Sequence, residues 1–176
     1  MIRIDESEYT NNQRLRTLGT LSGTDTITLT DQQSGGSIDT IYLALVDKFD
    51  QYVGSDSSST VTISITSSTT NETYTPVLSG TTTQTASKGM FVFDDLTFTA
   101  EPGRTFSLAF STTGIDIEKP SNAEYLASID ASDSDLSFSI SLRDCIVGEA
   151  FLISGECQEC EADNYYSLVA MDSPDS

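Results

Sequence analysis

The chain has 176 residues, of which 27 are acidic and 8 are basic, and its formal net charge is −19. Such a surface repels nucleic acid and anionic membranes, so both are disfavoured as direct partners. Histidine is absent, which removes the usual base for a Ser or Cys nucleophile, and we find neither a catalytic constellation nor a cofactor motif.

In chain order, residues 1–24 come first and have no clear periodic pattern, so we interpret them as an N-terminal extension or the end of a preceding module. They lack the apolar core of a signal peptide, and no apolar run in the chain reaches the length of a transmembrane helix. The chain is therefore either intracellular or part of a longer secreted protein. Thr26 to Thr30 alternate between threonine and large aliphatic residues, which predicts a half-buried strand.

Several later segments also have sequence patterns that predict β-strands. Residues 38–46 predict a strand that is apolar on both faces and therefore central in its sheet. Apolar residues alternate with serine or threonine over 61–65 and again over 136–142, the period of a strand with one buried face. Residues 74–79 and 81–85 are candidates for short edge strands.

Residues 88–111 carry the strongest pattern and predict a hairpin around which the other strands are organised. In its second strand, three large apolar side chains share one face. In its first strand, one apolar pair before Asp94-Asp95 has odd residue numbers and the pair after it has even numbers, so a regular strand would point them to opposite faces. A bulge or bend at Asp94-Asp95 is therefore needed to turn both pairs inward. The apolar residues concerned are Phe91, Phe93, Leu96, Phe98, Phe106, Leu108 and Phe110.

About seven short strands separated by turns, with no long helix, predict an all-β, Ig-like antiparallel β-sandwich over residues 25–144. Residues 112–135 form a longer connection than such a fold needs. We expect this loop to pack on the edge of the sandwich, with a short helix near residues 123–129.

Three segments, in this order along the chain, resemble a bacterial Ig-like repeat of the invasin and intimin type. The segments are 47–53 (DKFDQYV), 89–96 (GMFVFDDL) and 103–108 (GRTFSL). The similarity covers about residues 38–112, and it departs from the family where Asp50-Gln51 replaces Gly-Asn and Phe106 replaces tyrosine, with one extra residue before that aromatic. The resemblance implies a spacer or adhesive surface module, as in large surface proteins of bacteria and ciliates, and not an enzyme.

All three cysteines, Cys145, Cys157 and Cys160, lie within residues 145–176. The pattern Cys-x-x-Gly-Glu, Cys-x-x-Cys and Tyr-Ser in this segment is similar to the start of an EGF-like or TNF-receptor-like cysteine repeat. That resemblance implies a disulfide between Cys145 and Cys157, a partner for Cys160 beyond Ser176, and an extracellular or cell-surface location. The odd number of cysteines also fits a truncated repeat.

Other interpretations of the cysteines remain open at this point. Cys157-x-x-Cys160 has the spacing of half a zinc site, although the chain offers no histidine and only one further cysteine to complete it. A redox pair would be expected within a βαβ pattern, which is missing. The remaining alternative is three free buried thiols in a cytosolic protein.

Two further sites are candidates. Asp130, Asp133 and Asp135 place carboxylates close together in one loop, which suits calcium, although the match to an EF-hand is poor and a solvated loop is the alternative. Asn71 begins an Asn-Glu-Thr sequon in a predicted turn and would carry an N-linked glycan in a secreted protein.

The sequence thus predicts a non-enzymatic extracellular module, structural or adhesive, within a larger cell-surface or filament protein. Its expected partners are neighbouring modules or copies of the same protein, and it would contact a membrane only through other parts of the parent protein. The alternative is a carbohydrate- or protein-binding module that uses residues 112–135, with or without calcium.

Overall fold

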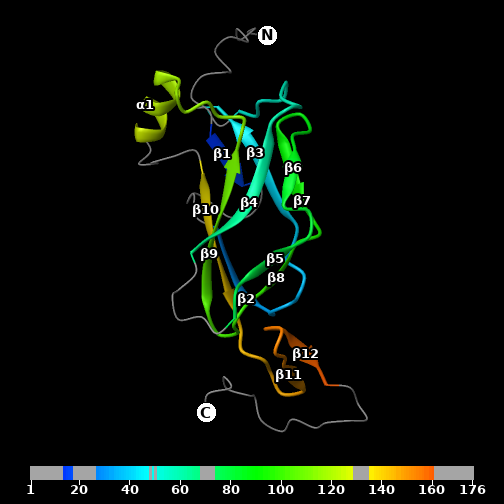
Figure 1. The fold of residues 1–176 in the computed structure, drawn as a ribbon. Coiled ribbons are helices and arrows are strands. Elements are labelled where there is room, and N and C mark those ends of the chain that lie inside the picture. The colour runs from blue at the N-terminus through cyan, green and yellow to red at the C-terminus, as the bar shows by residue number, and fades with distance from the viewer. Residues whose placement is uncertain are drawn as a thin grey trace.

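The computed structural model describes residues 14–17, 27–47, 49, 51–67, 74–128 and 135–160, and it has two β-sheets stacked face to face (Figure 1). The first sheet has the order β1 (Arg14–Thr17), β3 (Ile41–Val46) and β7 (Met90–Phe93). The second has the order β2 (Ile27–Gln32), β10 (Leu136–Leu142), β9 (Thr105–Thr112), β4 (Thr60–Ser67) and β6 (Thr83–Thr85). Two short pairs, β5 (Val77–Ser79) with β8 (Thr97–Thr99) and β11 (Glu149–Phe151) with β12 (Cys157–Glu159), and one helix, α1 (Pro120–Ser128), complete the described elements.

The alternating strands build this architecture directly. In β10 the apolar residues Leu136, Phe138, Ile140 and Leu142 are buried, while the serines between them face outward and are at least partly exposed. The neighbouring strands of the second sheet follow the same rule, so its outer face is rich in hydroxyl groups and its inner face is apolar. The predicted all-β, Ig-like sandwich is therefore confirmed. One pairing, between β2 and β10, is parallel, a detail that the sequence pattern does not predict.

Phenylalanine rings join the two sheets. Phe93 of β7 lies 5.4 Å from Phe110 of β9, measured between ring centroids, and Phe110 stacks on Phe138 of β10 at 4.9 Å. Near the other end of β9, Phe106 meets Phe98 edge to face at 5.3 Å. Each fully buried ring stabilises the fold by roughly 1.5–3 kcal/mol through burial alone. Of the three contacts, Phe93–Phe110 joins the two sheets, Phe110–Phe138 lies within the second sheet, and Phe98–Phe106 joins the β5–β8 pair to the second sheet.

The predicted hairpin over residues 88–111 is wrong. β7 belongs to the first sheet, β8 pairs with β5, and β9 is in the second sheet between β10 and β4. The bend at Asp94-Asp95 is present, and the apolar residues on both sides of it are buried as predicted. Asp95 fixes this bend because its carboxylate accepts hydrogen bonds from the backbone and the hydroxyl of Thr81. The chain therefore uses the bend to cross between sheets.

The two ends of the sandwich carry different additions (Figure 1). At one end lies α1, which begins at Pro120, slightly before the predicted 123–129 helix, and buries Leu126 in the core. At the opposite end lie β11 and β12. Residues 14–17, within the stretch interpreted as an extension, form β1 and pair with β3. No helix among the described residues is long and apolar enough to cross a membrane.

Candidate functional site

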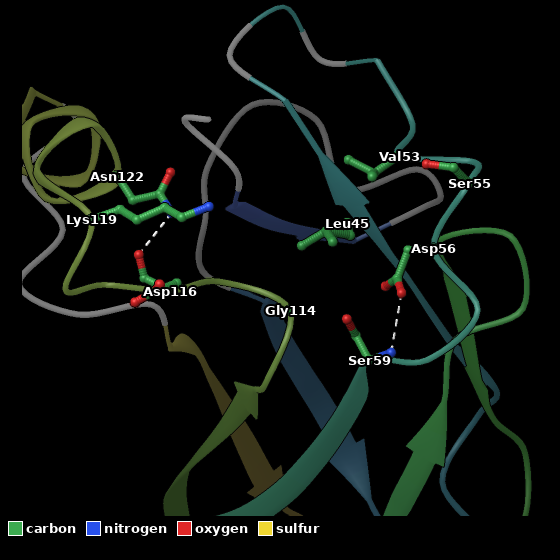
Figure 2. A pocket seen from close by; sticks show the side chains of 9 residues that line it. All are labelled: Leu45, Val53, Ser55, Asp56, Ser59, Gly114, Asp116, Lys119 and Asn122. Atoms are coloured by element: carbon green, nitrogen blue, oxygen red, sulfur yellow. Dashed lines mark hydrogen bonds between the residues drawn. The ribbon is translucent and has the colours of Figure 1, made fainter. Parts of the chain in front are cut away.

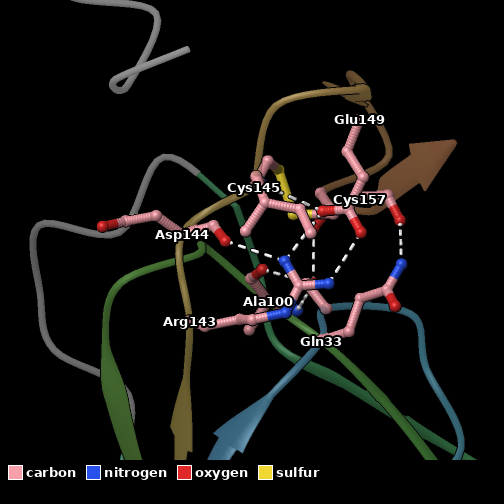
Figure 3. Close-up of a disulfide and its surroundings, with 10 residues drawn as sticks. Gln33, Ala100, Arg143, Asp144, Cys145, Glu149 and Cys157 are labelled. Atoms are coloured by element: carbon pink, nitrogen blue, oxygen red, sulfur yellow. Dashed lines mark hydrogen bonds and ion pairs between the residues drawn. A yellow bond between two sulfur atoms is a disulfide. The ribbon is translucent and has the colours of Figure 1, made fainter. Parts of the chain in front are cut away.

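The first candidate site is the junction between the sandwich and the cysteine segment, which we define as the described residues 145–160. Cys145 follows β10 closely, and its sulfur is bonded to that of Cys157 at the start of β12 (Figure 3). Both cysteines are almost completely buried, at 2% and 4% exposure. This pairing is the one that the cysteine-repeat resemblance implies, and it closes β11 and β12 onto the end of the sandwich.

Ser34 is the centre of the junction. Its side chain is fully buried, and its hydroxyl oxygen lies 2.6 Å from the carbonyl oxygen of Gly155 and 2.7 Å from that of Ala100. The single hydroxyl proton is donated to one of these carbonyls at a time, while the oxygen accepts the Ala100 amide at 3.0 Å. On either side, the Cys157 amide donates to the Ser34 carbonyl, and Gln33 Nε2 donates to the Cys157 carbonyl at 2.6 Å. A loop of the sandwich therefore holds the cysteine segment by hydrogen bonds.

An ion pair completes the junction. Arg143 Nη2 lies 2.6 Å from Glu149 Oε1, and the Arg143 and Glu149 side chains are only 20% and 7% exposed (Figure 3). The hydrogen bond from Arg143 lowers the pKa of Glu149, although burial by itself would raise it. The Ile146 amide adds a third donor to the same carboxylate. Glu149 is therefore ionised and held where the cysteine segment leaves the sandwich.

The junction also tests the zinc interpretation. Cys145, Cys157 and Glu149 bring their sulfur and oxygen atoms within 4.8 Å of one another, as metal ligands would. However, the two sulfurs are bonded to each other and the carboxylate is bonded to Arg143. Cys157 is thus not available as a ligand beside Cys160, which is a free and half-buried thiol.

The second candidate site is a cavity of about 240 Å³ at the α1 end of the sandwich (Figure 2). One wall comes from residues 53–59, which follow β3, and the other from residues 114–122, within the long connection that the sequence singled out. Leu45 forms an apolar floor. The polar lining consists of Ser55, Asp56, Ser59, Asp116, Lys119 and Asn122.

Asp56 is the best-defined polar group of this cavity. Its Oδ1 accepts hydrogen bonds from the amides of Ser58 and Ser59, at 3.0 Å and 3.1 Å. Burial would raise the pKa of Asp56, but hydrogen bonds from the amides and hydroxyls of Ser58 and Ser59 together outweigh it and hold the pKa below its ordinary value, so the group is a carboxylate. Its Oδ2 is hidden from solvent and has no hydrogen-bond partner among the described residues, which is rare for a buried polar atom.

The facing wall is held by its own contacts. Asp116 Oδ1 accepts the Glu118 amide at 3.1 Å, and its backbone carbonyl accepts Nδ2 of Asn122 at 2.7 Å. Asn122 is only 1% exposed. Figure 2 shows the Lys119 side chain extending from this wall toward the space between the two walls. The cavity thus combines carboxylate, amide, amine and hydroxyl groups.

Most of the other predicted site residues cannot be placed relative to either site. Asn71, Asp130 and Asp133 lie outside the described residues, so the glycosylation and calcium predictions stay predictions. Asp135 is described and exposed, next to the first residue of β10. A partner for Cys160 beyond the chain likewise stays a prediction.

Sequence reasoning missed several residues of both sites. Asp56 followed by a run of serines is a signal for a turn in which the carboxylate binds nearby amides, and that signal could have singled it out. Ser34, Lys119 and the Arg143–Glu149 pair had no such signal, because their roles depend on segments that meet only in the folded chain.

The sequence matches no known protein-family model, and no curated protein is significantly similar to it. Among solved structures, the fold is similar to that of WR4, a C. elegans MSP family member, with a TM-score of 0.35 and 11% sequence identity. The match covers 65% of this chain and 91% of that one.

Proposed function

We propose that this chain is a non-enzymatic structural module that holds the parts of a larger extracellular protein at a fixed separation and orientation. The observation that carries the proposal is the course of the chain. β1 begins at Arg14, opposite Val46, on the half of the sandwich that carries α1, whereas β12 lies beyond the opposite end (Figure 1). A sandwich whose first described strand starts near one end, and whose last described strand lies beyond the other, is suited to placing neighbouring modules in line.

The construction of the junction supports this role. Independent domains usually move relative to each other unless their interface is extensive. Here the cysteine segment is tied to the sandwich by the hydrogen bonds of Ser34 and by the edge-to-face contact of Tyr74 with Phe151, whose ring centroids are 5.0 Å apart. The Cys145–Cys157 disulfide closes the segment itself, shortly after β10. Such a junction transmits orientation from one module to the next.

The disulfide supports the extracellular part of the proposal. Disulfides persist in oxidising compartments and are rare in the cytosol. The resemblances to Ig-like repeats and to cysteine repeats of surface proteins support the same location.

Residual dipolar couplings of the oxidised, ¹⁵N-labelled chain test the rigidity. We expect amides of β9, β10, β11 and β12 to fit one alignment tensor. In Ser34→Ala the β11 and β12 amides should fit a separate tensor, whereas Ser37→Ala, an exposed serine of the same loop, should behave as wild type. Independent alignment of the two parts in the wild-type chain would contradict a spacer role.

Location is tested separately. Antibodies against the folded chain should label intact, unpermeabilised cells that produce the parent protein. Labelling that requires permeabilisation would contradict the extracellular assignment.

A further inference from the structure

We propose that the cavity between residues 53–59 and 114–122 is a binding site for a neutral saccharide. This function would be additional to the structural role, because the cavity lies at the end of the sandwich opposite the junction (Figure 1). The inference depends on the chemical groups of the lining, on their charges and on the size of the space.

The lining suits hydroxyl groups. A sugar hydroxyl both donates and accepts, so it is best met by acceptors and donors placed side by side. Asp56 and Asp116 offer carboxylate acceptors, Lys119 offers a donor, and Ser55 and Ser59 offer both.

The charges of the cavity favour a neutral ligand. Two carboxylates, Asp56 and Asp116, and the net charge of −19 for the whole chain oppose an anion such as a phosphate or an acidic sugar. Conversely, the Lys119 side chain extends toward the same space (Figure 2) and opposes a metal cation between the carboxylates. Hydroxyl groups are compatible with both signs of charge.

The volume of the cavity and its apolar lining suit a single sugar ring. A volume of about 240 Å³ is below the roughly 300–1,000 Å³ of sites for drug-sized ligands, so the cavity holds one small ring. Leu45 and Val53 give that ring apolar atoms to lie against.

The test is a titration of the oxidised, ¹⁵N-labelled chain with glucose, galactose, mannose and N-acetylglucosamine, each followed by amide chemical shifts. We expect at least one sugar to move the signals of Ser59, Gly114 and the Asn122 side-chain amide. Lys119→Ala should lower the affinity of the chain for that sugar about tenfold or more, because it removes a charged hydrogen-bond donor. Glu124→Ala alters an exposed residue of α1 that does not line the cavity, and this variant should bind as wild type.

Asp56→Asn provides a second variant, since it keeps one oxygen for the Ser58 and Ser59 amides but removes the negative charge that makes a carboxylate a strong acceptor. We expect it to bind the sugar more weakly while its spectrum keeps the wild-type dispersion. The proposal is overturned if none of the four sugars moves these signals, or if Lys119→Ala binds as wild type. It is also overturned if calcium chloride moves the same signals and the sugars do not, because the cavity is then a cation site.

Discussion

Arg143 holds Glu149 with both ends of its guanidinium group, at 2.8 Å from Nη1 to Oε2 and 2.6 Å from Nη2 to Oε1. This geometry is the bidentate one in which an arginine binds a carboxylate most specifically. Arg143 directly follows β10, and Glu149 is the first residue of β11. The pair therefore fixes the direction in which the chain leaves the sandwich, next to the disulfide that closes the same turn.

Glu149→Gln should lower the free energy of unfolding by about 1–3 kcal/mol, because the partly buried guanidinium of Arg143 loses its charged partner. Urea unfolding of the oxidised chain measures this change. The matched control is Glu159→Gln, which alters the exposed carboxylate opposite Glu149 in the β11–β12 pair and should change stability by less than about 0.5 kcal/mol. Equal effects of the two substitutions would show that the ion pair contributes nothing.

The same carboxylate predicts a pH dependence. Arg143 lowers the pKa of Glu149 below its ordinary value of 4.5, so the folded chain binds this proton less readily than the unfolded chain. The stabilisation is complete above the unfolded pKa and is lost as the pH falls through the lower, folded pKa. The stability difference between wild type and Glu149→Gln should therefore shrink from neutral pH to about pH 3. Urea unfolding at several pH values checks this, and a constant difference would refute it.

The strands were predictable because alternation records which side chains are buried. The burial of Phe91, Phe93, Leu96 and Phe98 and the bend between them followed from parity alone. The alternation of apolar and polar residues does not indicate which strands pair with each other. Two strands of a hairpin and two strands in different sheets therefore have the same sequence pattern. That is why residues 88–111 were predicted as a hairpin although β7 and β9 are in different sheets.

The sites were less predictable for a related reason. The disulfide pair was inferred only through a resemblance, since spacing does not decide which two of three cysteines pair. The cavity combines residues that are about sixty positions apart in sequence, such as Asp56 and Asn122, and single-sequence patterns carry no information at that range. The unusual length of residues 112–135 did indicate the segment that contributes one of its walls.

The disulfide should stabilise the cysteine segment more than the sandwich. A Cys145→Ala/Cys157→Ala double variant removes a cross-link between positions 12 apart in sequence, and closing a loop of roughly this size contributes about 3 kcal/mol. Hydrogen exchange should become faster in β11 and β12 while β9 and β10 remain protected. Cys160→Ala is the control and should leave exchange unchanged. Uniform acceleration across the sandwich would contradict a local role.

Two glycines provide the last and most local test of the junction. Gly35 has a φ of +81°, and a Cβ added there would lie 2.7 Å from Cγ of Glu156 in the cysteine segment. Gly54 has no positive φ, and a Cβ there would have no atom within 4 Å. The two sites therefore separate backbone strain and close packing from the general effect of replacing glycine.

Gly35→Ala should destabilise the chain by about 1–2 kcal/mol, because an L-residue is disfavoured in the left-handed region and the new methyl group displaces Glu156. Gly54→Ala should be neutral or stabilise it by up to about 1 kcal/mol, since it restricts only the unfolded chain. Thermal unfolding measures both values, and hydrogen exchange locates the loss, which we expect in β12, where the Cys157 amide donates to the Ser34 carbonyl. If Gly35→Ala left β12 protection intact, the loop around Ser34 would not be what holds the cysteine segment in place.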